Sequence, residues 1–545
     1  MRAREATQGG DTMTTFFRAA FTIGVLLLGS QVALAQKADP ALVRTTSGPV
    51  RGVIHDGLRE FKGIPYAQPP VGALRWQVPQ PVKPWKDVRD ASQFGAACPQ
   101  VSRYGLTEAS NDEDCLTLNV TAPYDGKPAR KKPVFVWIHG GAFVGGSSAL
   151  YPLGNLATAG DLVVVSMNYR LGVFGFMAHP GFGKAYNGGY GLKDQRLALA
   201  WVKKNIAAFG GDPDNITIAG ESAGGAGVCM HLIAPAETQG LYKRAIMQSA
   251  GCASPLHTIA DAAKIGTKVA EAVGCSDAKT AVACMRAKPV AELTAAASKV
   301  GGSDLLAFAP AVGTKTVPLQ AAEAFRTGKF VRVPVMNGGT REELRLYVAY
   351  DVQAGDKITA DNYADKLKTI YGANTDTVLA KYPAANYSSA PTALGSVMSD
   401  FNPSVGLNNC IYLEQGKLMR KRVPVYELVF ADRDAPPVTT DPGFEMGAVH
   451  SSELPYFFPH FDNTSKVAGP DLTPGSLALA KQMTAYWTSF ARDGKPVAKD
   501  SPAWRLFKAD GDVMRFDPGK VGPFDASVES NCAFWKKLYP SILTQ

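Results

Sequence analysis

One serine of this chain stands in a context that makes it a candidate nucleophile. Gly220-Glu221-Ser222-Ala223-Gly224 matches the pattern G-x-S-x-G, in which glycines leave room for a sharp, strained turn around the serine. The apolar residues of 215–219 predict a strand before this turn, and 226–232 predicts a helix after it. Such a turn lifts the serine hydroxyl out at the carboxyl end of a sheet. The bare pattern is common, but this context makes a chance turn the weaker interpretation.

A serine nucleophile needs a histidine as base, and the histidine needs an acid that orients it. In strand–turn–helix sites of this kind, the chain order is serine, acid, histidine. The chain has seven histidines, and only His450 and His460 lie far enough beyond Ser222 to follow an acid. His460 follows Phe-Phe-Pro and is typical of a surface position, whereas His450 lies in a loop that leads into an aromatic segment. We therefore predict His450 as the base.

The oxyanion that forms when a serine attacks a carbonyl must be met by fixed N–H donors. One donor is the backbone N–H that follows the nucleophile, which here belongs to Ala223. Gly140 and Gly141 directly follow an apolar run that ends at Ile138, and two adjacent glycines let the backbone turn its N–H groups into a cavity. We predict these three N–H groups as the oxyanion hole; a plain turn at the strand end is the alternative interpretation.

Alternating strand and helix patterns must position these residues. The apolar runs 133–138 and 162–167 are typical of strands buried on both faces of a parallel sheet, and 194–206 carries apolar residues at helical spacing. The stretch 255–400 is more helical and is predicted to form a cap around the site. The pattern predicts an α/β fold with a central, mostly parallel sheet, flanking helices and helical cap insertions.

Length and composition limit the classes of protein to consider. Of the 545 residues, 46% are apolar and 19% are charged, which favours a large folded core over a disordered chain. The net charge is +9, but the basic residues are scattered and form no patch on a nucleic-acid-binding module. No Pro/Gly/Ser-rich linker divides the chain, so we predict a single catalytic domain over residues 36–545.

The first 35 residues resemble a secretory signal peptide. Arg18 precedes a short apolar run over 19–28, and Ala33 and Ala35 form an A-x-A cleavage signal. A membrane anchor is the alternative, but this run is far shorter than the roughly 20 residues that a bilayer core requires. We predict cleavage after Ala35, a secreted or periplasmic protein, and no stable membrane anchor.

With these motifs in place, the chain resembles the type B carboxylesterases, the group that includes the cholinesterases, over roughly residues 42–540. The resemblance implies an α/β-hydrolase fold and ester hydrolysis. It is carried by motifs that occur in the family's order, namely 113–120 (EDCLTLNV), 139–143 (HGGAF), 168–172 (NYRLG), 190–195 (YGLKDQ), 209–213 (FGGDP) and 220–225 (GESAGG).

The resemblance also implies which residue is the acid of the triad. The family places it in a G-x-x-x-[DE]-E-G segment after a strand, and the match here is 338–344, Gly-Gly-Thr-Arg-Glu-Glu-Leu. Aligned in this way, Glu343 is the acid and Glu342 an exposed neighbour at the start of a helix. Leu344 stands where the family has glycine, so the turn that follows is expected to differ.

The resemblance implies further polar residues behind the triad and a set of disulfides. Glu221, Ser249 and Glu453 occupy positions of a buried polar network, which either tunes the imidazole or only satisfies buried hydrogen bonds. Export permits disulfides. Two cysteines, Cys229 and Cys252, have no partner in the family pattern and are expected to be buried thiols, or else to pair with each other. The implied bridges are Cys98–Cys115, Cys275–Cys284 and Cys410–Cys532.

The predicted reaction is hydrolysis of a small-molecule ester through an acyl-enzyme on Ser222, and it calls for no metal or cofactor. Choline esters are disfavoured because the segment between Cys98 and Cys115 lacks the tryptophan that cholinesterases present to the ammonium group. Arg341 and Arg345 flank the acid, which suggests esters of polycarboxylic acids, such as the tricarballylate esters of fumonisin that some family members cleave. The alternative is that both arginines form surface ion pairs and that the enzyme is a general carboxylesterase for small neutral esters.

Two other functions remain to be weighed. Some members of the family have lost the serine and act as binding proteins; here Ser222, Glu343 and His450 are all present. An amidase or lactonase would use the same triad, because the shape of the pocket selects the leaving group. The oligomeric state is left open.

Overall fold

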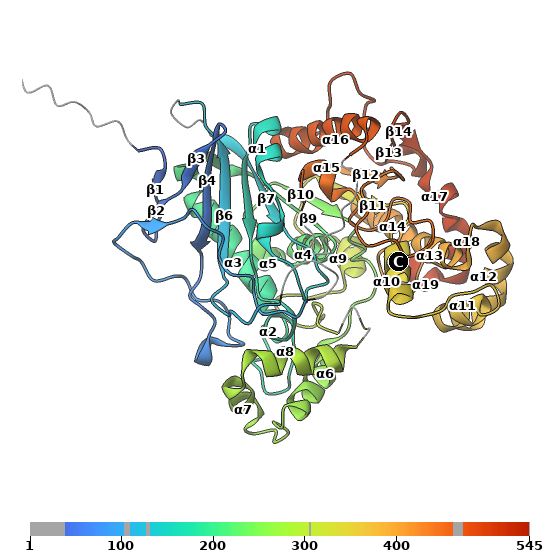
Figure 1. The fold of residues 1–545 in the computed structure, drawn as a ribbon, viewed down its shortest axis with the longest axis horizontal. Helices are drawn as coiled ribbons and strands as arrows, with labels where there is room; N and C mark the ends of the chain where they lie inside the picture. The colour runs from blue at the N-terminus through green and yellow to red at the C-terminus, as the bar shows by residue number, and fades with distance from the viewer. Residues whose placement is uncertain are drawn as a thin grey trace, which may run out of the picture. The chain divides into compact units, whose positions relative to one another are not determined.

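The computed structural model describes residues 39–102, 109–126, 131–302, 304, 307–461 and 472–543. The predicted signal peptide, residues 1–35, lies outside this part of the chain and stays a prediction. Within the described residues, the backbone is organised around one large sheet and a small one (Figure 1). The small sheet consists of β1 (Leu42–Arg44), β2 (Pro49–Arg51) and β5 (Arg89–Asp90).

The large sheet has eleven strands in the described residues, in the order β14-β13-β12-β11-β10-β9-β7-β8-β6-β4-β3. Neighbouring strands from β8 across to β13 run parallel, and antiparallel strands extend both edges. The strands are β3 (Val53–His55), β4 (Leu58–Pro65), β6 (Thr117–Pro123), β7 (Lys132–Ile138), β8 (Val163–Met167), β9 (Gly211–Glu221), β10 (Arg244–Gln248), β11 (Val335–Thr340), β12 (Val425–Phe430), β13 (Val513–Phe516) and β14 (Gly522–Phe524).

The central strands are buried on both faces, which explains their nearly continuous apolar sequences. Along β7, Val134 and Val136 pack into one core, whereas Phe135 and Trp137 pack into another on the opposite face. This alternation follows from the two-residue period of a strand. The runs predicted over 133–138 and 162–167 are thus confirmed as β7 and β8, and the fold is an α/β-hydrolase fold.

Helices cover the two faces of the sheet. One face packs against α1 (Gly154–Gly160), α15 (Leu454–Phe457) and α16 (Pro474–Asp493), which lie together in Figure 1. The other face packs against α3 (Tyr190–Asn205), α4 (Ala223–Leu232) and α14 (Asn409–Met419), with α9 (Ala321–Thr327) against α14. The predicted helix over 194–206 is therefore real, but it begins four residues earlier, at Tyr190.

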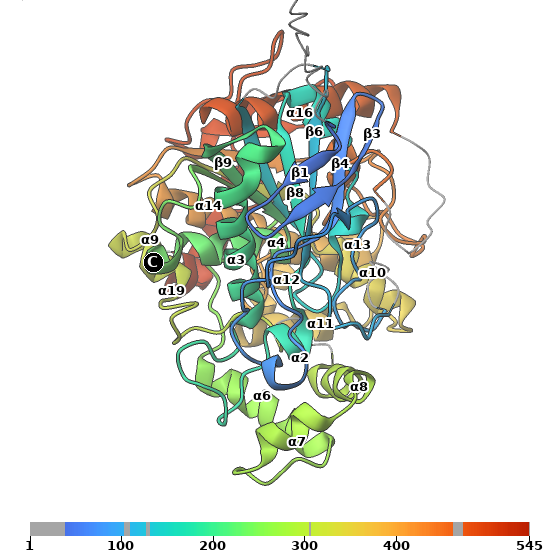
Figure 2. The ribbon, with the colours of Figure 1, turned by 90° about the vertical axis from the view of Figure 1, so that its left-hand side faces the viewer.

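The stretch predicted to be helical contains most of the remaining helices. Figures 1 and 2 both show α6 (Ile259–Ala272), α7 (Ala281–Ala287) and α8 (Val290–Gly301) grouped at the end opposite α16. The other helices are α2 (Gly172–Gly175), α5 (Pro235–Thr238), α10 (Arg345–Gln353), α11 (Tyr363–Tyr371), α12 (Thr375–Lys381), α13 (Ala390–Asp400), α17 (Ala526–Glu529), α18 (Cys532–Leu538) and α19 (Pro540–Leu543).

All eight cysteines are paired in the structure. The three bridges implied by the family resemblance are present: Cys98–Cys115, Cys275–Cys284 and Cys410–Cys532. The expectation of buried thiols at Cys229 and Cys252 is wrong, and the alternative that they pair with each other is confirmed, because they form a fourth bridge. They are 23 positions apart in sequence, and only the packing of α4 against β10 brings them together.

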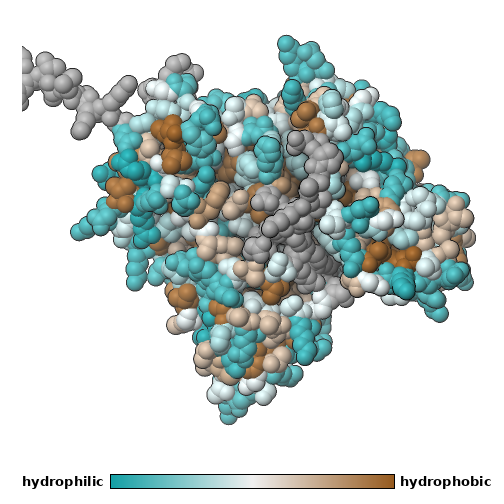
Figure 3. Space-filling model, in the orientation of Figure 1, coloured by the Kyte–Doolittle hydropathy of each residue, from teal (hydrophilic) through white to brown (hydrophobic). Residues whose placement is uncertain are grey.

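On the face drawn in Figure 3, the described residues form no extended apolar patch. In Figure 3, hydrophobic residues form small, separate groups among hydrophilic ones. No helix in the described ranges is both long enough and apolar enough to cross a membrane.

Candidate active site

Ser222 forms the whole turn between β9 and α4. The strand ends at Glu221, and the helix begins at Ala223. Ser222 has φ 56° and ψ −126°, a backbone conformation that residues other than glycine rarely adopt. A Cβ atom at Gly224 would lie 2.0 Å from the carbonyl oxygen of Ile138, so only glycine allows this close approach. The predicted strand stops at residue 219 and the predicted helix begins at residue 226, so both leave out the residues next to the turn. Those residues are rich in glycine, which carries no signal for either a strand or a helix.

A hydrogen-bonded relay joins Ser222 to His450 and Glu343. His450 Nε2 lies 2.8 Å from Ser222 Oγ, and His450 Nδ1 lies 2.6 Å from Glu343 Oε2. Nδ1–H donates to the carboxylate, and in the neutral imidazole the lone pair of Nε2 is then directed at the Ser222 hydroxyl. The serine follows β9, the glutamate follows β11, and the histidine lies in the loop before α15. Parallel strands end at one edge, so residues 107 and 228 positions from His450 meet there.

Glu343 is fully buried and accepts hydrogen bonds from several sides. Its Oε1 atom accepts from Ser249 Oγ at 2.6 Å, from the Tyr412 hydroxyl at 2.9 Å and from the Thr340 N–H at 2.8 Å. Burial acts to raise the pKa of Glu343, but the nearby charge of His450 and these hydrogen bonds lower it below its usual value. Glu343 is thus held as a carboxylate. Tyr412 was not found from sequence, since no local pattern marks it.

Two further buried carboxyl groups lie near the histidine. Glu221 Oε1 lies 3.3 Å from His450 Nε2 and accepts a hydrogen bond from Ser451 Oγ at 2.8 Å. Glu453 Oε1 accepts from Gln248 Nε2 at 3.0 Å. The three residues predicted to form one polar network make separate contacts. Ser249 contacts Glu343, Glu221 contacts His450, and Glu453 contacts Gln248.

The charges of this cluster favour a protonated histidine. Burial lowers the pKa of His450, but the carboxylates of Glu221 and Glu343 outweigh it and raise this pKa to about 9. Burial and the charges of Glu221 and Glu343 raise the pKa of Glu453 to about 8. The surroundings of His450 therefore stabilise its imidazolium form.

The predicted oxyanion donors lie beside the serine. A Cβ atom at Gly140 would lie 3.1 Å from Ser222 Cβ and 2.9 Å from the Glu221 carbonyl oxygen, so the loop approaches the nucleophile closely. Gly141, Ala142 and Phe143 all have positive φ. Within the described chain, none of the N–H groups of Gly140, Gly141 and Ala223 donates to another residue. They are available for a substrate oxygen.

Two cavities meet at Ser222. The first, here called the α4 cavity, has a volume of about 120 Å³, and the described residues that line it include no charged side chain. It is bounded by Ala223, Ala226, Met230, residues 249–252 and 254–256, and residues including Phe143, Pro310 and Leu407. The second, here called the aromatic cavity, has a volume of about 50 Å³ and is lined by His450, Glu221 and rings including Tyr151, Tyr347, Tyr350 and Phe461.

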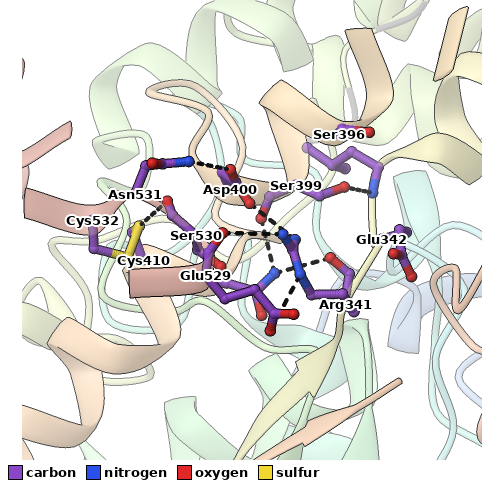
Figure 4. Close-up of polar contacts among 12 residues, drawn as sticks. Arg341, Glu342, Ser396, Ser399, Asp400, Cys410, Glu529, Ser530, Asn531 and Cys532 are labelled. Carbon is purple, nitrogen blue, oxygen red and sulfur yellow. Dashed lines mark hydrogen bonds and ion pairs between the residues drawn. A yellow bond between two sulfur atoms is a disulfide. The ribbon is translucent and has the colours of Figure 1, made fainter. Parts of the chain in front are cut away.

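The structure does not bring the flanking arginines to the nucleophile. Arg341 pairs with Asp400 at 2.9 Å and with Glu529 at 3.5 Å (Figure 4). Arg345 is 4% exposed and donates to Ser396 Oγ at 2.9 Å. Neither belongs to the described residues that line the two cavities. The hypothesis that these arginines bind a substrate carboxylate is not supported by this geometry.

The prediction that Glu342 is exposed is wrong. Its side chain is 2% exposed and accepts hydrogen bonds from the Ala448 N–H at 3.0 Å and from Arg433 Nη2 at 2.6 Å. Glu342 thereby ties the acid loop to the loop that carries His450. The family pattern places the residue next to the acid but does not show that the histidine loop covers it.

Comparisons with known proteins agree with this geometry. The family model described as "Carboxylesterase family" matches residues 39–535. A para-nitrobenzyl esterase of Bacillus subtilis is 33% identical, covering 84% of this chain and 90% of its own length. A fumonisin B1 esterase of Sphingopyxis macrogoltabida is 33% identical, covering 88% of this chain and 87% of its own length. An acetylcholinesterase of Bungarus fasciatus is 32% identical, covering 95% of this chain and 90% of its own length.

Solved structures give the same result. A structure titled as a thermophilic pNB esterase is 30% identical, with a TM-score of 0.76, and covers 91% of this chain and all of its own. In the described residues, no group of three or more His, Cys, Asp or Glu side chains is arranged to hold a metal ion. By sequence and by fold, the chain belongs to the carboxylesterase family and is a carboxylic-ester hydrolase of the cholinesterase-like type.

Proposed function

We propose that Ser222, His450 and Glu343 are a catalytic triad that hydrolyses uncharged carboxylic esters through an acyl-enzyme. The observation that carries this proposal is the unbroken relay from Ser222 Oγ through His450 to Glu343, at the junction of two cavities. Spacing of 2.6–2.8 Å along the relay is the geometry that general-base catalysis requires.

The reaction proceeds in two halves. His450 Nε2 takes the hydroxyl proton as Ser222 Oγ attacks the ester carbonyl, and the N–H groups of Gly140, Gly141 and Ala223 meet the developing oxyanion. The imidazolium then donates its proton to the leaving alcohol, and the acyl group stays on Ser222. Water, deprotonated by His450, attacks the acyl-enzyme and releases the acid. Glu343 remains a carboxylate throughout and stabilises the imidazolium.

The two cavities suggest where each half of the ester binds. The leaving oxygen must face His450 Nε2 to receive its proton, so the alcohol occupies the aromatic cavity, which His450 lines. The acyl group then extends in the remaining direction, into the α4 cavity beside Ala223. This division follows from the tetrahedral geometry of the intermediate.

The preference for uncharged esters rests on the lining of the α4 cavity. A carboxylate placed there would lose its hydration without gaining a charged or strongly polar partner, which is costly. Arg341 and Arg345 already bind protein groups. We therefore propose a general carboxylesterase for small neutral esters rather than an enzyme for tricarballylate esters.

We further propose that the protein acts outside the cytoplasm. Four disulfides fit an oxidising compartment, and the sequence of residues 1–35 predicts export.

The test is a comparison of esters that share one alcohol. The values of kcat/KM are measured for p-nitrophenyl butyrate and for a p-nitrophenyl tricarballylate monoester, at low and high salt, with Ser222→Ala as the control. We expect a burst of p-nitrophenol, preferred turnover of the butyrate, and no turnover by the variant. Equal or better turnover of the charged ester would overturn the substrate class, and full activity of Ser222→Ala would overturn the triad.

A further inference from the structure

The α4 cavity lies between two walls of different character. One wall is α4 itself, where Ala223, Ala226 and Met230 recur at helical spacing and face the cavity. The other is residues 249–256, here called the wall segment, which follows β10. The distance between these two walls limits the width of any acyl group that binds between them.

The Cys229–Cys252 disulfide joins the two walls. Cys229 belongs to α4 and lies next to Met230, and Cys252 belongs to the wall segment and lines the cavity. Both residues are buried. The covalent cross-link therefore runs from the nucleophile helix to the opposite side of the cavity.

Besides the disulfide, the centre of the wall segment is held by contacts with α14 and with Gly406, whose carbonyl oxygen would lie 1.6 Å from a Cβ atom at Gly251. The wall segment contains no helix or strand, so no regular hydrogen-bond ladder holds it. Gln415 on α14 accepts from the Ala253 N–H at 3.0 Å and donates to the Ala250 carbonyl oxygen at 3.0 Å, which ties the segment to α14 rather than to α4. Towards α4, the disulfide is the covalent constraint.

We propose that the Cys229–Cys252 disulfide is a specificity-determining cross-link that sets the width of the acyl cavity. This inference rests on the proposed function, which assigns the α4 cavity to the acyl group. Without the bridge, the wall segment can move away from α4, and the cavity then admits longer acyl chains and fits short ones less closely. Discrimination in apolar pockets depends on such contact, methylene by methylene.

The same change should leave the triad in place. Ser249, which donates to Glu343, begins the wall segment, but its own N–H donates to the Gly338 carbonyl oxygen at 2.7 Å. This bond holds Ser249 to β11 independently of the disulfide. Loss of the bridge is therefore expected to alter the preference for acyl chains more than the chemistry at Ser222.

The experiment compares a Cys229→Ala/Cys252→Ala double variant with the wild-type protein on p-nitrophenyl acetate, butyrate, hexanoate and octanoate. We expect the ratio of kcat/KM for octanoate to that for acetate to rise about tenfold in the variant. The burst amplitude per mole of protein and the preference among alcohols of acetate esters should stay unchanged. The matched control is Cys275→Ala/Cys284→Ala, which removes a bridge between α7 and the loop after α6 and should keep the wild-type ratio.

An unchanged ratio in a double variant with a normal burst overturns the cross-link proposal and leaves a purely stabilising bridge. Full activity of Ser222→Ala overturns the proposed function instead. Should the double variant fail to fold, the bridge is opened in the folded wild-type protein with dithiothreitol, which is then removed and leaves a thiol at Cys252 in the cavity. Reaction of that thiol with methyl methanethiosulfonate should reduce turnover of octanoate far more than of acetate, and equal losses would overturn the proposal.

Discussion

The carboxylate of Glu221 lies 3.3 Å from His450 Nε2, the same nitrogen that lies 2.8 Å from Ser222 Oγ. Because Glu221 is the residue before the nucleophile, the strained turn at Ser222 presents both side chains to one imidazole. Glu343 holds the opposite ring nitrogen. The histidine thus lies between two buried carboxylates, and their charges favour its protonated form.

We expect the pH dependence of the enzyme to respond to Glu221. His450 must be neutral to accept a proton. The charge of Glu221 is the largest of the effects that raise the pKa of His450 to about 9. In Glu221→Gln that charge is lost, the pKa of His450 falls, and the acid limb of kcat/KM moves to lower pH by about one unit or more. The measurement is a pH profile of kcat/KM on a neutral ester. A limb that stays in place or moves to higher pH contradicts this account.

Substitution of Glu343 should reduce turnover without removing substrate binding. In Glu343→Gln the amide no longer stabilises the imidazolium, and kcat is expected to fall by about 10³–10⁴-fold, with a small change in KM. Glu342→Gln is the matched control one residue away. It removes the charge that Arg433 and the Ala448 N–H bind, so it should lower the melting temperature while kcat falls far less. The reverse pattern would assign the acid to position 342.

Tyr412 should contribute to the triad although it does not touch the substrate. Its hydroxyl donates to Glu343 Oε1 at 2.9 Å, and Tyr412→Phe removes that bond, so the pKa of Glu343 rises. A hydrogen bond to a charged group contributes about 1.5–3 kcal/mol, and we expect kcat to fall by about ten- to a hundredfold. Steady-state kinetics of the variant check this prediction, with a lower kcat and an unchanged KM as the expected result. A kcat equal to that of the wild-type protein would contradict it.

Arg341 should matter for folding and not for substrate charge. Its guanidinium pairs with Asp400, which is 3% exposed, so Arg341→Met leaves a buried carboxylate that keeps hydrogen bonds from Tyr382 and Asn531 but loses its cation (Figure 4). We expect a loss of about 3–5 kcal/mol in the free energy of unfolding, measured by urea denaturation. The ratio of kcat/KM for charged and neutral esters should not change. A selective loss on the charged ester would restore the hypothesis that Arg341 binds a substrate carboxylate.

Several features of this enzyme could be predicted because they depend only on residues that are neighbours in the sequence. The strand, the turn and the helix around Ser222 are consecutive in sequence. The apolar run 133–138 is likewise followed directly by the loop that contains Gly140 and Gly141, the predicted oxyanion donors. Chain order and family pattern then pointed to His450 and Glu343, which the structure brings within hydrogen-bond distance. Their catalytic roles stay predictions until the variants above are measured.

Other features depend on which distant segments pack together, and no local pattern records this. Glu342 is buried because the histidine loop covers it, Tyr412 reaches Glu343 across 69 positions, and Arg341 meets an aspartate at the end of α13. The cysteine pair at 229 and 252 illustrates the same limit, since α4 and the wall segment come together at the α4 cavity only when the chain folds. The sequence alone determined the reactive groups and their order along the chain. The three-dimensional packing decided their charges, their partners and the shape of the space around them, because burial and proximity set those properties.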